Sequence, residues 1–123
     1  MMLKMDIDGK KVDWKRIKTV VEMFKLKINI PESKIAKTKR GFHIYLHCND
    51  KLNDEDVCFI QLACNSDYKR EILNLLRVKK GDWQGDNFNV LFAKKYHVDT
   101  KGKTTLASEE VELDNEILRR KLK

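Results

Sequence analysis

Two stretches in which apolar and polar residues alternate decide the fold: LKMDID at residues 3–8 and FHIYLHC at residues 42–48. Alternation with a period of two is typical of a β-strand with one buried and one exposed face. Both stretches therefore predict strands that turn their apolar side chains towards a core. Their polar side chains then share the opposite face of a sheet.

The segments around these strands complete an alternating order of strands and helices. Asp13 can cap a helix, Asn53 followed by three acidic residues can begin another, and Lys101-Gly102 is typical of a turn. In chain order we expect a strand at residues 2–8, a helix from residue 14 to before Pro31, a strand at 33–39, a strand at 42–48, a helix in two pieces from residue 54 to about 77, a strand at 88–92, a turn between two strands around 101–102 and a helix at 114–123.

This βαββαβ order predicts an α+β fold of the ferredoxin-like or RRM-like type. In that fold the first and third strands lie side by side at the centre of a four-stranded antiparallel sheet, and two helices cover one face. A C-terminal β-turn and short helix would follow. We expect one domain, with residues 1–95 as its body and residues 96–123 as an appendage of the same domain.

Composition limits the classes of function. The chain has 123 residues, 41% apolar and 37% charged, with a net charge of +7. No apolar run approaches the eighteen residues of a membrane span, and we expect neither a signal peptide nor a disulfide framework, since the three cysteines form no CxxC pair. The sequence thus predicts a cytoplasmic protein. The excess of basic residues favours nucleic acid or nucleotide phosphates as partners, although a lysine-rich surface is also typical of thermophile proteins.

The polar face of the predicted sheet brings carboxylates next to an imidazole. Asp6 and Asp8 would lie beside His43 and Tyr45 on the neighbouring strand. Carboxylates two residues apart can bind Mg²⁺ or Mn²⁺, leaving positions for water and phosphate oxygens, and a nearby histidine can hydrogen-bond a phosphate. The alternative is an ordinary solvated strand face.

Basic side chains could form a track for a nucleic-acid template or a triphosphate. Trp83 could stack on a base, or it could anchor its loop against the core. The basic candidates, each of which could also be plain solvated surface, are Lys37, Lys39, Arg40, Arg70, Arg77, Lys94 and Lys95.

Three motifs together resemble a known family. The apolar run with Asp6-Ile7-Asp8 is similar to the DxD motif of archaeo-eukaryotic primases and primase-polymerases, and TKRGFHIY at residues 38–45 is similar to their second motif, a turn leading to a strand histidine. Residues 65–77 and 90–95 resemble small primase-like proteins of archaea and of their viruses and plasmids. The resemblance covers roughly residues 3–95.

The resemblance implies a palm-like domain that transfers nucleotides in DNA replication with Mg²⁺ or Mn²⁺ as cofactor. It makes Asp6 and Asp8 metal ligands and places His43 against the phosphates of the incoming nucleoside triphosphate. The family's third acid aligns best with Asn74, and Asp67 and Asp99 are the nearby alternatives. DNA or RNA, and a replication protein, would be the macromolecular partners.

Two further hypotheses remain at this point. The first is an RRM-like module that binds single-stranded nucleic acid on its sheet, because Arg40-Gly41-Phe42 is similar to the start of an RNP1 motif. Register argues against it, since the alternation assigns Phe42 and Ile44 to the core, and metal-free carboxylates would repel a phosphate backbone. The second is a non-catalytic member of the primase-like family that serves as a replication accessory protein.

Overall fold

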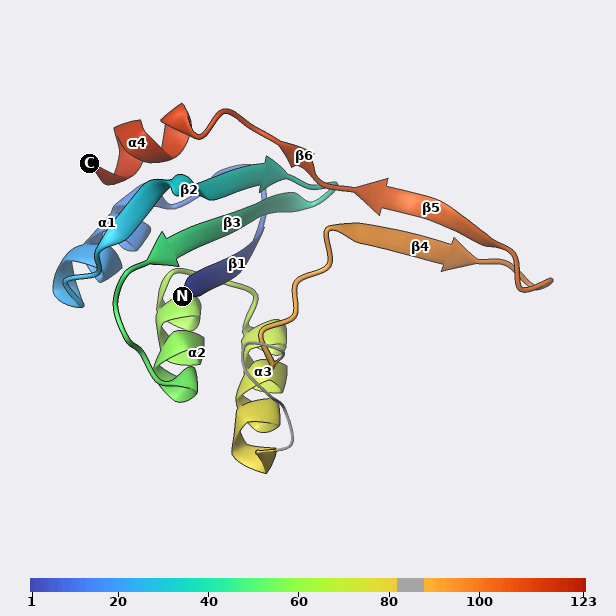
Figure 1. Ribbon diagram of the computed structural model, residues 1–123. Coiled ribbons are helices and arrows are strands. Elements are labelled where there is room, and N and C mark those ends of the chain that lie inside the picture. Colours follow the sequence, from blue (N-terminus) through green and yellow to red (C-terminus); the bar gives the residue numbers. More distant parts are fainter. Residues whose placement is uncertain (82–87) are drawn as a thin grey trace.

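The computed structural model describes residues 1–81 and 88–123, and the chain forms an α+β fold (Figure 1). The secondary-structure elements in chain order are β1 (Met2–Asp8), α1 (Trp14–Met23), β2 (Ile28–Lys37), β3 (Gly41–Cys48), α2 (Asp54–Ala63), α3 (Tyr68–Lys80), β4 (Lys94–Val98), β5 (Thr104–Glu109), β6 (Val111–Glu112) and α4 (Glu116–Leu122).

The central sheet is antiparallel and has the strand order β1-β3-β2-β6. The predicted pairing of the first and third strands is confirmed, with Met5 opposite Ile44 and Asp6 opposite His43. The alternation also orients the strands as expected, because Leu3, Met5 and Ile7 are all buried in the core. The core then lies between this face of the sheet and the helices.

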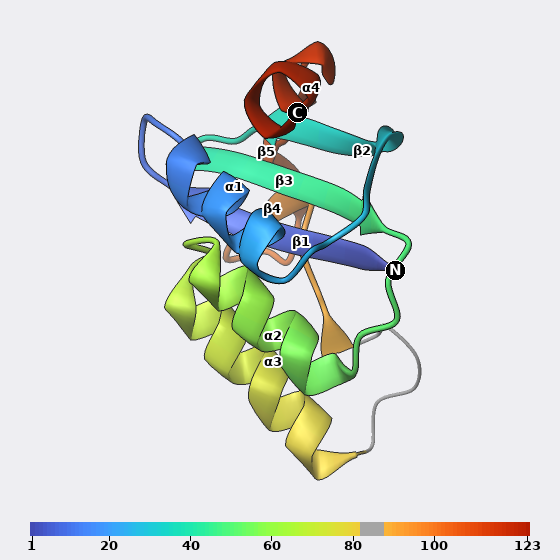
Figure 2. The ribbon, with the colours of Figure 1, turned by 90° about the vertical axis from the view of Figure 1, so that its left-hand side faces the viewer.

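The helices begin where the sequence places side-chain caps. Asp13 accepts a hydrogen bond from the Arg16 amide at the start of α1, and Asn53 accepts one from the Asp56 amide at the start of α2. Asn65 adopts a left-handed φ of 73°, which asparagine tolerates, and it separates α2 from α3. α1 lies in front of the sheet, with α2 beside β1 and α4 beside β2 (Figure 2).

The predicted strand at 88–92 is wrong, and β1 is consequently an edge strand rather than a central one. In place of that strand, side chains and the backbone amide of Asp67 form hydrogen bonds with the outer edge of β1. The Lys4 amide donates to Gln61 Oε1 at 2.8 Å, the Asp6 amide donates to Ser66 Oγ at 3.0 Å, and Arg70 donates to the Lys4 carbonyl at 2.8 Å. Because these groups already satisfy β1, residues 88–92 have no ladder to join.

The fourth strand of the sheet is instead β6, which pairs with Ala36 and Lys37 at the far edge of β2. β2 is also longer than predicted, starting at Ile28 and passing through Pro31. The strand register shifts between Asn29 and Lys34, so the proline, which cannot donate a hydrogen bond, sits in the irregular part of the ladder.

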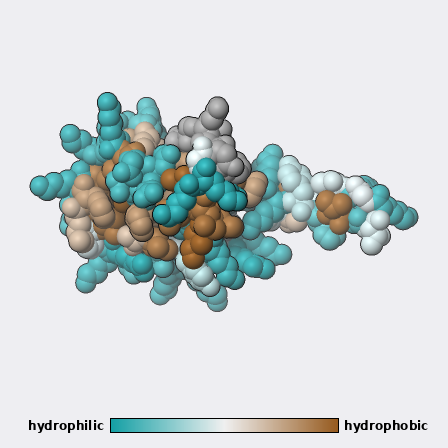
Figure 3. All heavy atoms as spheres, turned by 90° about the horizontal axis from the view of Figure 1, so that it is seen from below, coloured by the Kyte–Doolittle hydropathy of each residue, from teal (hydrophilic) through white to brown (hydrophobic). Residues whose placement is uncertain are grey.

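β4 and β5 form a separate two-stranded hairpin that protrudes from the body (Figure 1). The predicted turn at Lys101-Gly102 lies at its tip, where Asp99 accepts hydrogen bonds from the amides of Lys101 and Lys103. Viewed from the α3 side, exposed apolar side chains gather over the helical part of the body, with a smaller group on the hairpin (Figure 3).

Candidate functional site

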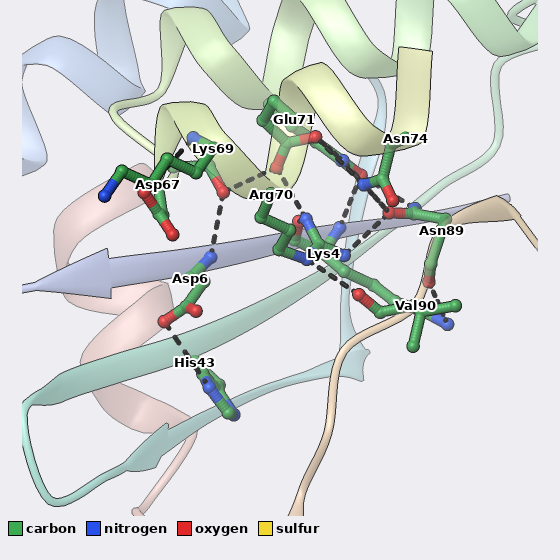
Figure 4. Close-up of polar contacts among 12 residues, drawn as sticks. Lys4, Asp6, His43, Asp67, Lys69, Arg70, Glu71, Asn74, Asn89 and Val90 are labelled. Carbon is green, nitrogen blue, oxygen red and sulfur yellow. Dashed lines mark hydrogen bonds and ion pairs between the residues drawn. The ribbon is translucent and has the colours of Figure 1, made fainter. Parts of the chain in front are cut away.

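The polar face of the sheet brings Asp6 and His43 together, as the sequence predicts. The antiparallel register sets the two residues opposite each other, and Asp6 Oδ1 lies 3.5 Å from His43 Nε2 (Figure 4). Asp8 is exposed two residues further along β1, opposite Gly41. His43 is only 3% exposed although its neighbours are polar. A residue outside strands β1 and β3 therefore covers the His43 side chain.

The covering residue is Glu110, which directly follows β5. Its Oε2 lies 2.7 Å from His43 Nδ1 and accepts a hydrogen bond of 2.8 Å from the Tyr45 hydroxyl, while its Oε1 lies 3.1 Å from Lys34 Nζ. The Glu110 amide donates to the Ala93 carbonyl, which fixes the segment over the sheet. The imidazole is thus held between two carboxylates. Sequence reasoning missed Glu110, because it stands in an acidic stretch with no local pattern of its own.

These contacts shift the pKa values of Asp6, Glu110 and His43. The contact with His43 lowers the pKa of Asp6 and outweighs the effect of burial. Burial alone would raise the pKa of Glu110, but its bonds to His43, Tyr45 and Lys34 lower it. Burial alone would lower the pKa of His43, but the bonds to Asp6 and Glu110 raise it overall. The cluster therefore favours an imidazolium between two ionised carboxylates.

We expect the stability gained from this cluster to depend on pH. A raised His43 pKa stabilises the fold fully below its ordinary value of 6.5, and the gain is lost as pH rises through the folded value. The lowered carboxylate pKa values stabilise the fold above 4.5, and that gain is lost as pH falls. In thermal melts, the Tm difference between wild type and His43→Gln should be largest between pH 4.5 and 6.5 and should shrink as the pH rises above 6.5 through the raised pKa of His43. A difference that is constant over this range would contradict the charged pairing.

A pocket of about 380 Å³ opens over this cluster. It combines acidic and basic side chains from strands β1 and β3, the turn between β2 and β3, the start of α3 and the root of the β4–β5 hairpin. We call it the Asp6 pocket. It is lined by Asp6, Asp8, Thr38, Lys39, Arg40, His43, Asp67, Phe92, Ala93, Lys95, Ala107, Ser108, Glu109 and Glu110.

Of the candidates for a third acid, the structure brings Asp67 to the Asp6 pocket. Asp67 caps α3 through a bond from the Lys69 amide, and its own amide donates to the Asp6 carbonyl at 2.7 Å. Asp99 lies at the tip of the hairpin instead, where it accepts hydrogen bonds from the amides of Lys101 and Lys103. Asn74 is fully buried, where its amide nitrogen lies 3.2 Å from Glu71 Oε1, and it does not line the pocket.

Asn74 belongs to a buried polar network on the outer side of β1 (Figure 4). At its centre is Glu71, which accepts hydrogen bonds from Gln61, Ser66 and Arg70. Arg70 also donates to the carbonyls of Lys4 and Val90. The role of this network is therefore structural: it holds α3 and residues 88–90 against β1.

The remaining predicted binding residues divide into two groups. Lys39, Arg40 and Lys95 line the Asp6 pocket, whereas Arg77 bonds to Asn74 and to the Phe88 carbonyl, and Lys94 pairs with Glu109 on the hairpin. The Tyr45 hydroxyl donates a hydrogen bond to Glu110. Trp83 lies outside the described residues.

Within residues 1–81 and 88–123, no three histidine, cysteine or acidic side chains are grouped so that they could share a metal ion. In the same part of the chain, no helix combines the length and apolar character that crossing a membrane requires. Comparison of the chain with protein-family models, curated proteins and solved structures finds no match. The primase-like interpretation consequently rests on the motifs and on the geometry of the Asp6 pocket.

Proposed function

We propose that the protein is a metal-dependent nucleotidyltransferase of the primase-polymerase type, which acts on nucleoside triphosphates and a nucleic-acid strand. The observation that carries the proposal is the composition of the Asp6 pocket. Asp6, Asp8 and Asp67 share it with Lys39, Arg40 and Lys95. Carboxylates beside cations match a substrate that arrives as a complex of a divalent cation and a polyphosphate.

The donor set of the pocket fits Mg²⁺ or Mn²⁺. Mg²⁺ is commonly held by one or two carboxylates together with substrate phosphates and water, so a third protein ligand is not needed before the triphosphate binds. Asp6 and Asp8 would hold the ion, with Asp67 at the same pocket. When bound, the ion would neutralise phosphate charge during displacement of pyrophosphate by an attacking hydroxyl.

The other pocket residues would orient the triphosphate. Lys39 and Arg40 come from the tight turn before Gly41, and Lys95 comes from the hairpin root, so two separate segments of the chain would contact the phosphates. His43 is fixed by Glu110 through Nδ1, while within the described residues its Nε2 has the longer contact with Asp6, at 3.5 Å. A phosphate oxygen could compete for that nitrogen. The RRM-like palm is part of this proposal and is supported by the β1-α1-β2-β3 order and the β1–β3 pairing.

We expect the double substitution Asp6→Asn, Asp8→Asn to weaken Mn²⁺-dependent binding of ATP at least about tenfold and to lower primer extension about 100-fold or more, because charge stabilisation dominates phosphoryl transfer. Calorimetry and an extension assay measure the two effects. Asp56→Asn, which changes an exposed acid on α2, is the matched control and should leave both unchanged. Unaltered ATP binding in the double variant would contradict the assignment.

A second candidate function is a non-catalytic module that binds single-stranded nucleic acid. Within the described residues, no three potential metal ligands are grouped together, and this favours the binding module. The net charge of +7 favours it as well. It predicts oligonucleotide binding that weakens steeply with salt, without Mn²⁺-dependent incorporation. Measuring extension and binding on the same preparation separates the two candidates.

A further inference from the structure

A second cavity, of about 260 Å³, adjoins the Asp6 pocket. We call it the Leu73 pocket. The two cavities have five lining residues in common, namely Asp6, His43, Asp67, Phe92 and Lys95. A ligand held in the Asp6 pocket can therefore extend into the Leu73 pocket without passing through the bulk of the protein.

The chemistry of the two cavities differs. Among the residues found only in the Leu73 pocket, Leu73 of α3 and the neighbours Val90 and Leu91 add an apolar wall. The others are the basic residues Lys69, Arg70 and Arg77. Phe92 stands where the two cavities meet, and it is 67% exposed, while Leu73 is 53% exposed. Leaving large apolar side chains open to water is unfavourable, and here two of them line one cavity.

From this arrangement we infer that the Leu73 pocket binds the base of the nucleotide whose phosphates lie in the Asp6 pocket. The inference rests on the proposed function. The flat face of a purine or pyrimidine would pack on the Phe92 ring and on Leu73, while the triphosphate remains beside Lys39, Arg40 and Lys95. Contact through the face of the base is tolerant of its identity, because every base has a π-face. The protein itself would thus bind the base without a template strand.

The test compares ligands that contain or lack each half of the nucleotide. Calorimetry with Mn²⁺ should show ATP binding more tightly than inorganic tripolyphosphate. Phe92→Ala should weaken ATP about tenfold, the scale of one base–aromatic contact, and leave tripolyphosphate within about twofold. Ile72→Ala is the matched control, since Ile72 is a similarly exposed apolar residue of α3 that does not line the pocket. It should change neither affinity.

Adenosine separates this inference from the proposed function. It carries no phosphate, so its weak binding should be lost in Phe92→Ala and retained in Asp8→Asn, because Asp8 lines the Asp6 pocket and not the Leu73 pocket. The base pocket is refuted if tripolyphosphate binds as tightly as ATP, or if Phe92→Ala weakens the binding of ATP and of tripolyphosphate equally. In either case the phosphate and metal site stands. If adenosine binds and depends on Phe92, but Mn²⁺ and tripolyphosphate do not bind, the nucleotidyltransferase proposal fails and the base pocket remains. Absence of binding by all three ligands refutes both.

Discussion

The Gly41→Ala variant should lose about 3 kcal/mol or more of its free energy of unfolding. A Cβ added at Gly41 would lie 1.8 Å from the carbonyl oxygen of Ile7 and 3.0 Å from Cα of Asp8. Both are backbone atoms of the paired strand, so a rotamer change cannot relieve the clash. The amide and the carbonyl of Gly41 are also bonded to Thr38, which leaves the turn little room to move. β1 and β3 would have to separate at the end that carries Asp8.

Urea unfolding followed by circular dichroism measures this loss. Gly102→Ala is the control, because a Cβ there meets nothing within 4 Å and costs only the strain of a left-handed φ of 80°, about 1–2 kcal/mol. The Gly41 variant should also lose Mn²⁺-dependent ATP binding, since Asp6 and Asp8 depend on the same strand pairing. Equal destabilisation of the two variants would show that the close approach of β1 and β3 at Gly41 is not what requires glycine.

The Glu71→Ala variant should be destabilised by about 3–5 kcal/mol, because a buried charge pair loses one partner. Glu71 is 2% exposed and accepts hydrogen bonds from four side chains, those of Gln61, Ser66, Arg70 and Asn74. Removing its carboxylate leaves the Arg70 guanidinium without its ion-pair partner beside the Lys4 carbonyl, and it releases Ser66, which accepts from the Asp6 amide. Thus the same change loosens the outer edge of β1.

Two comparisons isolate the cause. Glu71→Gln keeps an acceptor oxygen and the side-chain shape, so it should cost less than the alanine change. Glu22→Ala removes an exposed acid from α1 and should alter the unfolding free energy by no more than about 0.5 kcal/mol. If Glu71→Ala unfolds at the same urea concentration as Glu22→Ala, the polar network around Glu71 does not take the place of a neighbouring strand at the outer edge of β1.

Local pattern was enough to predict the elements that contain their own signal. The alternation in β1 and β3 predicts which side chains enter the core, and antiparallel pairing then sets Asp6 opposite His43. The caps Asp13 and Asn53 mark helix starts because a side-chain oxygen next to free amides is a local arrangement. These predictions need only neighbours in sequence and the geometry of a sheet.

The strand expected at residues 88–92 failed for the opposite reason. Its apolar residues are typical of a strand, but a strand requires a partner edge with free amides and carbonyls. Gln61, Ser66 and Arg70 satisfy the outer edge of β1, and they come from α2, α3 and the turn between these helices, far away in the sequence. The pattern of apolar residues along a sequence does not show which groups will form hydrogen bonds with the edge of a strand.

By itself the sequence determined the α+β class, the β1–β3 pairing and the proximity of Asp6 to His43. Periodicity assigns the two faces of each strand locally, and the order of the elements places the two strands side by side. Only the tertiary structure decided that Glu110 covers His43, that Asp67 rather than Asn74 reaches the Asp6 pocket, and that the Leu73 pocket adjoins it. Each of these depends on where a distant segment returns to the sheet. Such a return is set by the packing and hydrogen bonding of the whole chain, which no short stretch of residues contains.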